Sequence, residues 1–477
     1  MSTAKNIKYY LNCAIVFLLM FGFPHLPTIE PLTDYGMQIV GIFLGCLYGW
    51  NLISVVWPSF LGLLALGFTE YGTMQATFAS AYGSDRFMFV FFMLTFAALI
   101  TQSGVTDYIA KWVISRKIAR GKPWVVAGLV YLAAYIVGGV VSVLPSIVIC
   151  WTLVYQLCAE FGYTNKDLYP KLLVIGVVNA ALMGHCVFPF KAFAIIVLGV
   201  LNTQLGLSVN YVLFTLFAFV LGFGGVIIWM LLCKYVYKPD VSLIKNSTYV
   251  YENTDKLTRY QKQVLVLLAA VIFLMFLPGF LPECAVKWFL SSLGTTGTVV
   301  AALMLCTVLK RQNGESFADI VSLIKMGVPW PTMILLATAM ALALALNNGT
   351  GVGALLQQFL EPILEGHGVA LFFILVIIFG VIITNIANNV VVAMILMPIV
   401  CTFSGILNFP PEILAVTCCL TLNITFFFPS VSPIAAFLHG NSEWVSSVEI
   451  QKYTWGYIVL MCVWCIFICL TLGNIIW

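Results

Sequence analysis

The sequence predicts an all-α polytopic membrane protein with about 11 transmembrane helices and two re-entrant helical hairpins, arranged as an inverted-topology repeat. The first observation is composition, because 62% of the 477 residues are hydrophobic and only 8% are charged, whereas soluble domains carry about 25% charged residues. The second is that apolar stretches of spanning length recur along the whole chain. The third is that two apolar stretches, 124–159 and 369–404, are too long and too interrupted to read as simple crossings.

Hydropathy predicts spans at 10–27, 36–50, 53–69, 87–102, 168–205, 209–233, 262–280, 294–309, 330–347, 411–438 and 454–475. The first span follows Lys5 and Lys8 and ends without a small-residue cleavage site, so we expect a retained helix rather than a signal peptide. The 14 cysteines are scattered along apolar helices, and we expect small buried side chains rather than disulfides or a metal site.

The lysines and arginines favour hairpins for both interrupted stretches. If the N-terminus is cytoplasmic and both stretches return to the side from which they entered, 22 − 3 = 19 of the 22 basic residues face the cytoplasm. The three exceptions are Arg86 and Lys287, which fall outside, and Lys191, which lies in the membrane. A single crossing at 124–159 would instead separate Lys166 and Lys171 from the other cytoplasmic charges. We therefore expect a multi-pass protein of the cell (plasma or inner) membrane with a cytoplasmic N-terminus.

The chain divides into two halves with the same order of features. We expect N-terminal scaffold helices (1–85), a first repeat (86–237) with hairpin 124–159 and broken helix 168–205, a cytoplasmic linker (238–261), further scaffold helices (262–328), and a second repeat (329–477) with hairpin 369–404 and broken helix 411–438. On the predicted topology the two hairpins open to opposite sides. This arrangement is typical of alternating-access transporters, which bind their substrate between the repeats near the bilayer midplane.

Two polar clusters interrupt the apolar second half. The first runs from Thr384 to Val390 and contains three asparagines, and the second contains two prolines four residues apart with serines between them, from Pro429 to Pro433. Carbonyls freed by a broken helix, together with Thr, Asn and Ser oxygens, suit a monovalent cation, whereas amide donors and helix N-termini suit an anion. The alternative is that these side chains only join packed helices through hydrogen bonds.

In the first half the informative residues are His185 and Lys191. Lys191 is the only polar side chain between Val187 and Leu201, and a lysine at that depth costs a few kcal/mol unless it is paired. We expect its ammonium, or a protonated His185, to supply the fixed positive charge that a sodium ion would otherwise supply; proton coupling through His185 is an alternative. The alternative without a functional role is that the Lys191 side chain extends to the membrane interface.

The acidic residues exclude several function classes. All 18 fall in loops or near helix ends on this topology, which argues against a carboxylate proton relay and against transport of divalent cations. No nucleophile–base pair and no metal-ligand set is apparent, so we do not expect an enzyme. Amides, hydroxyls, helix termini and a lysine without acids predict an anion-selective site.

The second half resembles a known family. Asn388-Asn389-Val390 stands where the divalent anion/sodium symporters of the ion-transporter superfamily have Ser-Asn-Thr, and Met397-Pro398 follows at the expected distance. The resemblance implies that Asn389 contacts both cation and substrate, that Thr384 and Ala387 ligate sodium, and that Val431-Ser432-Pro433 replaces an Ala-Thr-Pro. It also implies a homodimer. The first half departs further, and the best placement puts Ser142 and Ser146 at the hairpin tip and Gly184 at the helix break.

Together these features predict an elevator-type secondary active transporter of a small anion, a di- or tricarboxylate first, coupled to sodium by symport or working as an exchanger (antiport). A transporter of sulfate-like anions and an uncoupled anion channel are the alternatives. Expected partners are the anionic solute, the bilayer and a second copy, without nucleic acid, and the one expected cofactor-like group is a sodium ion. The expected substrate contacts are Ser146, His185, Lys191, Asn388, Asn389, Val390, Ser432 and Pro433, and the expected sodium ligands are Ser142, Gly184, Thr384, Ala387, Asn389 and Val431.

Overall fold

The computed structural model describes residues 2–115, 118, 120–245, 256–311, 314–347, 349–364, 368–429 and 431–477. These residues form helices joined by short connections, and among them the sole β-type pairing is an isolated bridge between Lys310 and Ser316. Ten helices are long and apolar enough to cross a membrane, or 11 if the bent pair 320–346 is one span. The predicted class, a polytopic all-α membrane protein, is confirmed. Part of the predicted linker, 246–255, lies outside the described residues.

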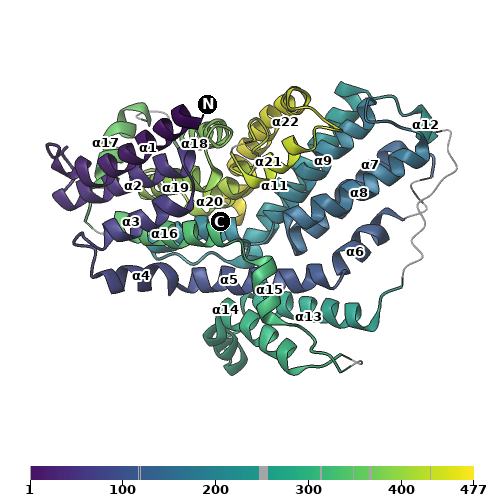
Figure 1. The fold of residues 1–477 in the computed structure, drawn as a ribbon, viewed down its shortest axis with the longest axis horizontal. Helices are drawn as coiled ribbons and strands as arrows, with labels where there is room; N and C mark the ends of the chain where they lie inside the picture. The colour runs from purple at the N-terminus through teal and green to yellow at the C-terminus, as the bar shows by residue number, and fades with distance from the viewer. Residues whose placement is uncertain are drawn as a thin grey trace.

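The N-terminal helices form one flank of the molecule (Figure 1). They are α1 (Ser2–Phe17), continued by η1 (Leu18–Gly22) and η2 (Phe23–His25), then α2 (Asp34–Leu52), α3 (Val56–Leu66) and α4 (Met74–Tyr82). The stretch predicted as a span at 53–69 contains an 11-residue helix. At about 1.5 Å per residue it covers about half of the hydrocarbon thickness, because the chain turns just before Val56 and again after Leu66.

The first repeat begins with α5 (Asp85–Gln102) and the short α6 (Val105–Ile114), which are followed by the hairpin α7 (Pro123–Val140) and α8 (Val143–Phe161). Then come α9 (Leu168–His185), α10 (Ala192–Leu205), α11 (Tyr211–Leu231) and η4 (Leu232–Tyr237), and the short α12 (Ser242–Lys245) lies in the predicted linker. The second repeat has the same order: α16 (Trp330–Asn347), α17 (Val352–Leu364), the hairpin α18 (Gly368–Thr384) and α19 (Asn389–Leu407), α20 (Pro411–Thr421), α21 (Pro433–Gly440) and α22 (Ser447–Ile468), ending in η6 (Cys469–Gly473) and α23 (Asn474–Ile476).

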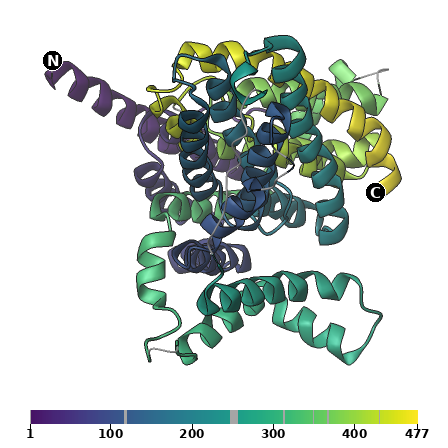
Figure 2. The ribbon, with the colours of Figure 1, turned by 90° about the vertical axis from the view of Figure 1, so that its right-hand side faces the viewer.

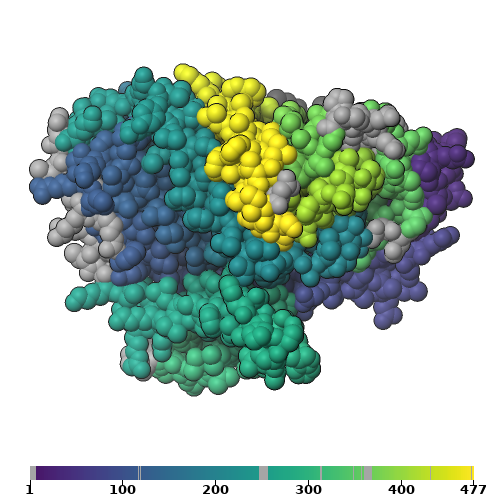
Figure 3. Space-filling model, turned by 180° about the vertical axis from the view of Figure 1, so that it is seen from behind, coloured from purple at the N-terminus to yellow at the C-terminus, as the bar shows by residue number. Residues whose placement is uncertain are grey.

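Both interrupted apolar stretches form helical hairpins. The first turns at 141–142 and the second at 385–388, and in each the two helices pack against one another. The hairpins lie in opposite halves of the molecule (Figure 1), and from behind α22 runs between the first-repeat and second-repeat helices (Figure 3). The two helices predicted to be broken are α9/α10, interrupted at 186–191, and α20/α21, interrupted at 422–432.

The remaining helices, α13 (Arg259–Phe276), η5 (Leu277–Gly279), α14 (Ala285–Val308) and α15 (Ile320–Gly327), form a layer along one face of the molecule (Figure 2). Large apolar side chains point outward from this layer, including Val266, Phe273, Trp288 and Met304, each 61–72% exposed. A soluble protein rarely exposes so much apolar surface. The layer therefore suits contact with lipid or with another apolar helix surface.

Glycines set the distance between the first hairpin and α9. A Cβ on Gly184 would lie 2.0 Å from the carbonyl oxygen of Tyr135, and one on Gly138 would lie 2.4 Å from that of Ala181. The two helices are therefore in backbone contact, a close approach that only small residues allow in a membrane. Gly184 thus positions the hairpin turn beside the break in α9/α10.

Candidate functional site

The break between α9 and α10 presents one buried charge. Pro189 lacks an amide N–H and cannot continue α9, and Lys191 has extended backbone at the N-cap of α10. The side chain of Lys191 is buried (4% exposed), and its Nζ donates to the Val141 carbonyl oxygen at the first hairpin turn over 2.9 Å. An ammonium has three donors, and Val141 is its only hydrogen-bond partner among the described residues. Lys191 therefore does not extend to an interface but places its side-chain nitrogen at the hairpin tip.

The other residues predicted in the first half surround this turn in different roles. His185 ends α9, and its Nδ1 is buried without a partner in the described part of the chain. Ser142 is the N-cap residue of α8, but its side chain makes no capping bond. Ser146 points into the hairpin, where its hydroxyl donates to the Ala134 carbonyl over 2.8 Å. The Ser146 hydroxyl thus joins α7 to α8 instead of facing the tip, while Gly184 contributes close packing.

Asn385 fixes the tip of the second hairpin against the interruption of α20/α21. Its Nδ2 donates to the carbonyls of Val381 (2.9 Å) and Ile424 (2.8 Å), and its Oδ1 accepts from the amides of Phe426 (3.0 Å) and Phe427 (3.1 Å). Three of these groups belong to the non-helical stretch 422–432, where the backbone has no helical partners of its own. One buried side chain thus satisfies backbone that would otherwise be costly at membrane depth.

The predicted residues of the second tip lie along the same stretch. The Thr384 hydroxyl donates to the Leu422 carbonyl over 2.7 Å, and Asn389 Nδ2 donates to Asn423 Oδ1 over 3.1 Å. Asn388 caps α19 by accepting from the Val390 amide at 3.0 Å. Ala387, Asn388, Asn389 and Val390 are all partly exposed at this tip.

The start of α21 completes this cluster. Ser432 caps the helix by accepting from the Ala435 amide over 3.0 Å, and its hydroxyl also pairs with that of Thr425 at 2.8 Å. Val431 is buried, whereas Pro433, the first residue of α21, is exposed. Ser430 lies outside the described residues. The hairpin tip and the N-terminus of α21 therefore border the same non-helical segment, as the proline and asparagine patterns predict.

A short chain of hydrogen bonds joins the two breaks. Asn423 receives the bond from Asn389 and in turn donates through Nδ2 to the Cys419 carbonyl over 2.8 Å. The same carbonyl accepts from the thiol of Cys186, the C-cap residue of α9, at 3.1 Å. The second hairpin tip is thereby connected to the break that carries Lys191.

The N-terminal helices also touch the second tip. The backbone amide of Asn388 donates to Oδ1 of Asn51, in the last turn of α2, over 3.0 Å. Beside this bond lies a cavity of about 580 Å³, walled by leucines of η1 and α2 together with Tyr48 and by Ile386 and Ala387 of the tip. The tip contributes only apolar side chains to this space, and its polar lining, Tyr48 and Asn51, comes from α2.

Sequence reasoning did not select Asn385, Asn423 or Asn51 as site residues. Asn385 and Asn423 had a usable signal, because each is an amide within an apolar stretch and must find partners. Asn51 had none, because it is exposed and its partner is 337 residues away in the chain. Within the described residues no group of three or more His, Cys, Asp or Glu side chains could hold a metal ion.

The structure has hairpins in opposite halves, two broken helices and polar hairpin tips. Together with the matches below, these features identify a polytopic transporter and not an enzyme. The citrate transporter family model (CitMHS) matches residues 44–421, and the chain belongs to this family. The narrower resemblance to divalent anion/sodium symporters is not matched by that model. No curated protein matches the chain.

Solved structures share the fold. The Alcanivorax borkumensis YdaH transporter, described as having an unusual topology, is 13% identical with a TM-score of 0.61, over 98% of each chain. Neisseria gonorrhoeae MtrF, described within a class of antimetabolite efflux pumps, is 12% identical with a TM-score of 0.61, over 97% of this chain and 94% of its own. Both are transporters, and at these identities the similarity concerns the fold.

Proposed function

We propose that this protein is a secondary active transporter of a small carboxylate, with citrate and dicarboxylates as the first candidates and sulfate-like anions second. The observation that carries the proposal is the buried ammonium of Lys191, which holds the first hairpin tip through Val141 and has two further N–H donors. Among the described residues it makes no ion pair with an acidic side chain. A buried charge without a counter-ion is costly, and an anionic solute removes that cost by binding there.

The second tip supplies neutral polar groups for the same anion. Asn388 and Asn389 are partly exposed at the tip, and α21 directs its N-terminus, capped by Ser432, to the adjoining segment. Backbone amides at a helix N-terminus and side-chain amides both favour a carboxylate. Asn388, Asn389, Val390, Ser432 and Pro433 thus form one wall of the proposed binding site, and Lys191 with His185 forms the other.

We further propose that the two cation sites of this architecture are unequal. In the first half, the Lys191 ammonium donates to the Val141 carbonyl at the hairpin tip and takes the place of a sodium ion. In the second half, Thr384, Ala387, Asn389 and Val431 surround the tip without a basic side chain, so a sodium ion is the cation that fits. The resemblance to divalent anion/sodium symporters supports this coupling, and exchange of one anion for another is the alternative.

The proposed movement is that of an elevator, in which the hairpins and broken helices slide as a unit past the N-terminal helices and the layer α13–α15, in a homodimer. The Cys186–Cys419–Asn423–Asn389 chain supports a single moving unit, because it joins elements of both repeats. The apolar outer surface of α13 and α14 supports a membrane-embedded contact with a second copy.

The test is uptake of radiolabelled citrate into proteoliposomes with and without a sodium gradient, in wild type and Lys191→Gln. Loss of a charge-assisted hydrogen bond predicts an affinity about 10- to 150-fold weaker. The matched control is Lys287→Gln, a partly exposed lysine paired to Glu283. Unchanged affinity in Lys191→Gln would refute the assigned role of the lysine. Conductive flux without saturable counterflow would identify an anion channel instead.

A further inference from the structure

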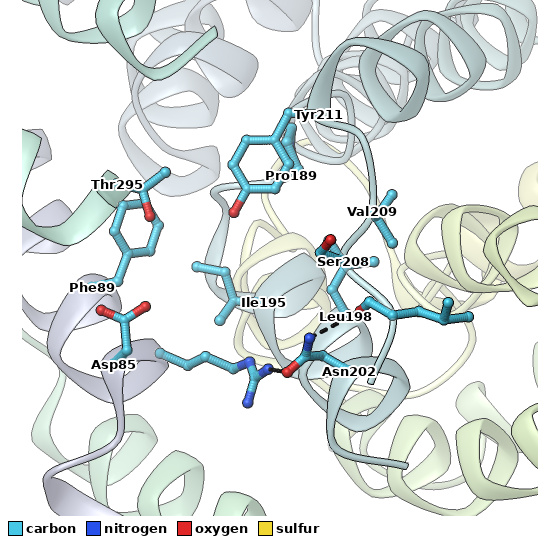
Figure 4. Close-up of a pocket in the computed structure, with 12 residues that line it drawn as sticks. Asp85, Phe89, Pro189, Ile195, Leu198, Asn202, Ser208, Val209, Tyr211 and Thr295 are labelled. Atoms are coloured by element: carbon cyan, nitrogen blue, oxygen red, sulfur yellow. Dashed lines mark hydrogen bonds between the residues drawn. The ribbon is translucent and has the colours of Figure 1, made fainter. Parts of the chain in front are cut away.

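A second polar cleft lies between α5, α10, the start of α11 and α14, and Pro189 of the α9/α10 break also lines it, whereas Lys191 does not (Figure 4). Its volume is about 180 Å³, and its polar lining consists of Asp85, Arg86, Asn202, Ser208, Tyr211 and Thr295. Drug-sized ligands need roughly 300–1,000 Å³, so this cleft admits only a small molecule. Hydroxyl, amide and guanidinium groups converge on it, and Figure 4 shows the Tyr211 hydroxyl turned toward Thr295.

Arg86 is the feature that gives the cleft its chemistry. Its side chain crosses α10 at Gly199, where an added Cβ would lie 3.1 Å from Arg86 Cδ, and its Nη2 donates to Asn202 Oδ1. A guanidinium has five donors, and this is its only hydrogen bond among the described residues. Arg86 is half-buried at the N-terminal end of α5, and most of its N–H donors have no hydrogen-bond partner among the described residues.

The neighbouring Asp85 does not neutralise it directly. The Asp85 carboxylate accepts from the Thr296 hydroxyl at 2.7 Å, and no ion pair forms between Asp85 and Arg86. The two side chains thus have different hydrogen-bond partners, Thr296 for Asp85 and Asn202 for Arg86. A ligand with a carboxylate for Arg86 and a hydroxyl donor for Asp85 complements both, and Ser208, Tyr211 and Thr295 add hydroxyl partners for the remaining oxygens.

We propose that this cleft is a second binding site for a small carboxylate, with hydroxycarboxylates as the preferred class, held by Arg86 and separate from the site at Lys191. Arg86 binds the carboxylate through a bidentate pair of N–H donors, and Asn202 orients the guanidinium. The predicted topology places the cleft on the outer side, where an arriving anion meets it first. This role as the first contact for an arriving anion rests on the proposed function, whereas binding of a carboxylate in the cleft does not.

Calorimetric titration of purified full-length protein with citrate, and separately with sulfate and phosphate, tests the proposal. Wild type is expected to show two classes of citrate site, and Arg86→Gln to lose one of them or weaken it at least about tenfold. Arg86→Lys keeps the charge without the planar fork and should bind with intermediate affinity. Lys287→Gln on neighbouring α14 should match wild type, and Lys191→Gln should affect the other class. Size-exclusion profiles confirm that each variant is folded.

The outcomes separate the two proposals. If Arg86→Gln titrates like wild type with all three anions, or if wild type has no Arg86-dependent binding, the second site is refuted. If Arg86-dependent binding persists while proteoliposomes take up no anion, only the transport function fails. A lipid phosphate is the other source of this chemistry. Loss of the Arg86-dependent signal in nanodiscs that contain phosphatidylglycerol, but not in those of phosphatidylcholine, would assign the cleft to lipid and overturn the soluble-ligand proposal.

Discussion

The thiol of Cys186 donates to the carbonyl of Cys419 over 3.1 Å, and this bond joins the C-cap of α9 to the last turn of α20, two helices that belong to different halves of the chain. Both groups are buried, so neither has water as an alternative partner. Asn423 donates to the same carbonyl and extends the link to the second hairpin. The two halves are therefore fastened at their least regular points, where a helix alone would leave backbone groups unpaired.

Asn385 is expected to be the most costly asparagine to lose. Its replacement by alanine leaves the Phe426 and Phe427 amides and the Ile424 carbonyl without their partner. We expect Asn385→Ala to reduce stability by roughly 1–3 kcal/mol, measured by thermal unfolding of the purified protein. Asn165→Ala, which removes one exposed bond to the Glu443 carbonyl, is the control and should change stability by less than about 0.5 kcal/mol. Equal unfolding temperatures for the two variants would contradict the stabilising role assigned to the hydrogen bonds of Asn385.

Gly184 is expected to tolerate no side chain. Because a Cβ would meet the Tyr135 carbonyl oxygen at 2.0 Å, Gly184→Ala must push the first hairpin away from α9, at an expected cost of about 3 kcal/mol. Gly405→Ala is the matched helical control, since nothing lies within 4 Å of the added methyl. That variant should be neutral or more stable by up to about 1 kcal/mol. Citrate binding to both variants checks whether the displacement also moves Lys191 from Val141.

Asn51 is expected to affect transport more than stability. Asn51→Ala removes the acceptor that holds the Asn388 amide against the N-terminal helices, and the side chain is exposed. We expect an unfolding free energy within about 0.5 kcal/mol of wild type, with an altered turnover rate in proteoliposomes, because the proposed elevator movement breaks this contact. The control is Asn12→Ala, which loses an acceptor for the Tyr48 hydroxyl between two N-terminal helices. An unchanged rate in Asn51→Ala would show that the contact does not restrain the tip.

The parts of this structure that sequence predicts are those with a local physical cause. Prolines at 189 and 433 and the runs around them predict where the helices break, and the distribution of basic residues favours the hairpins that the structure shows. The direction of a side chain has no such local cause. Ser146 points at Ala134 within its hairpin, and the 53–69 stretch forms a short helix despite its apolar length. Contacts such as Asn51–Asn388 or Arg86–Asn202 depend on how distant segments pack, which a single sequence does not encode locally.

The amide nitrogen of Asn385 supplies both of the hydrogen-bond donors that this side chain contributes. Hydrolytic loss of that amide nitrogen gives aspartate, whose carboxylate cannot donate to the carbonyls of Val381 and Ile424 and would repel both. A molecule changed at this one atom would keep an unbroken chain but lose the bond from Asn385 to the Ile424 carbonyl that ties the second hairpin to the interruption of α20/α21.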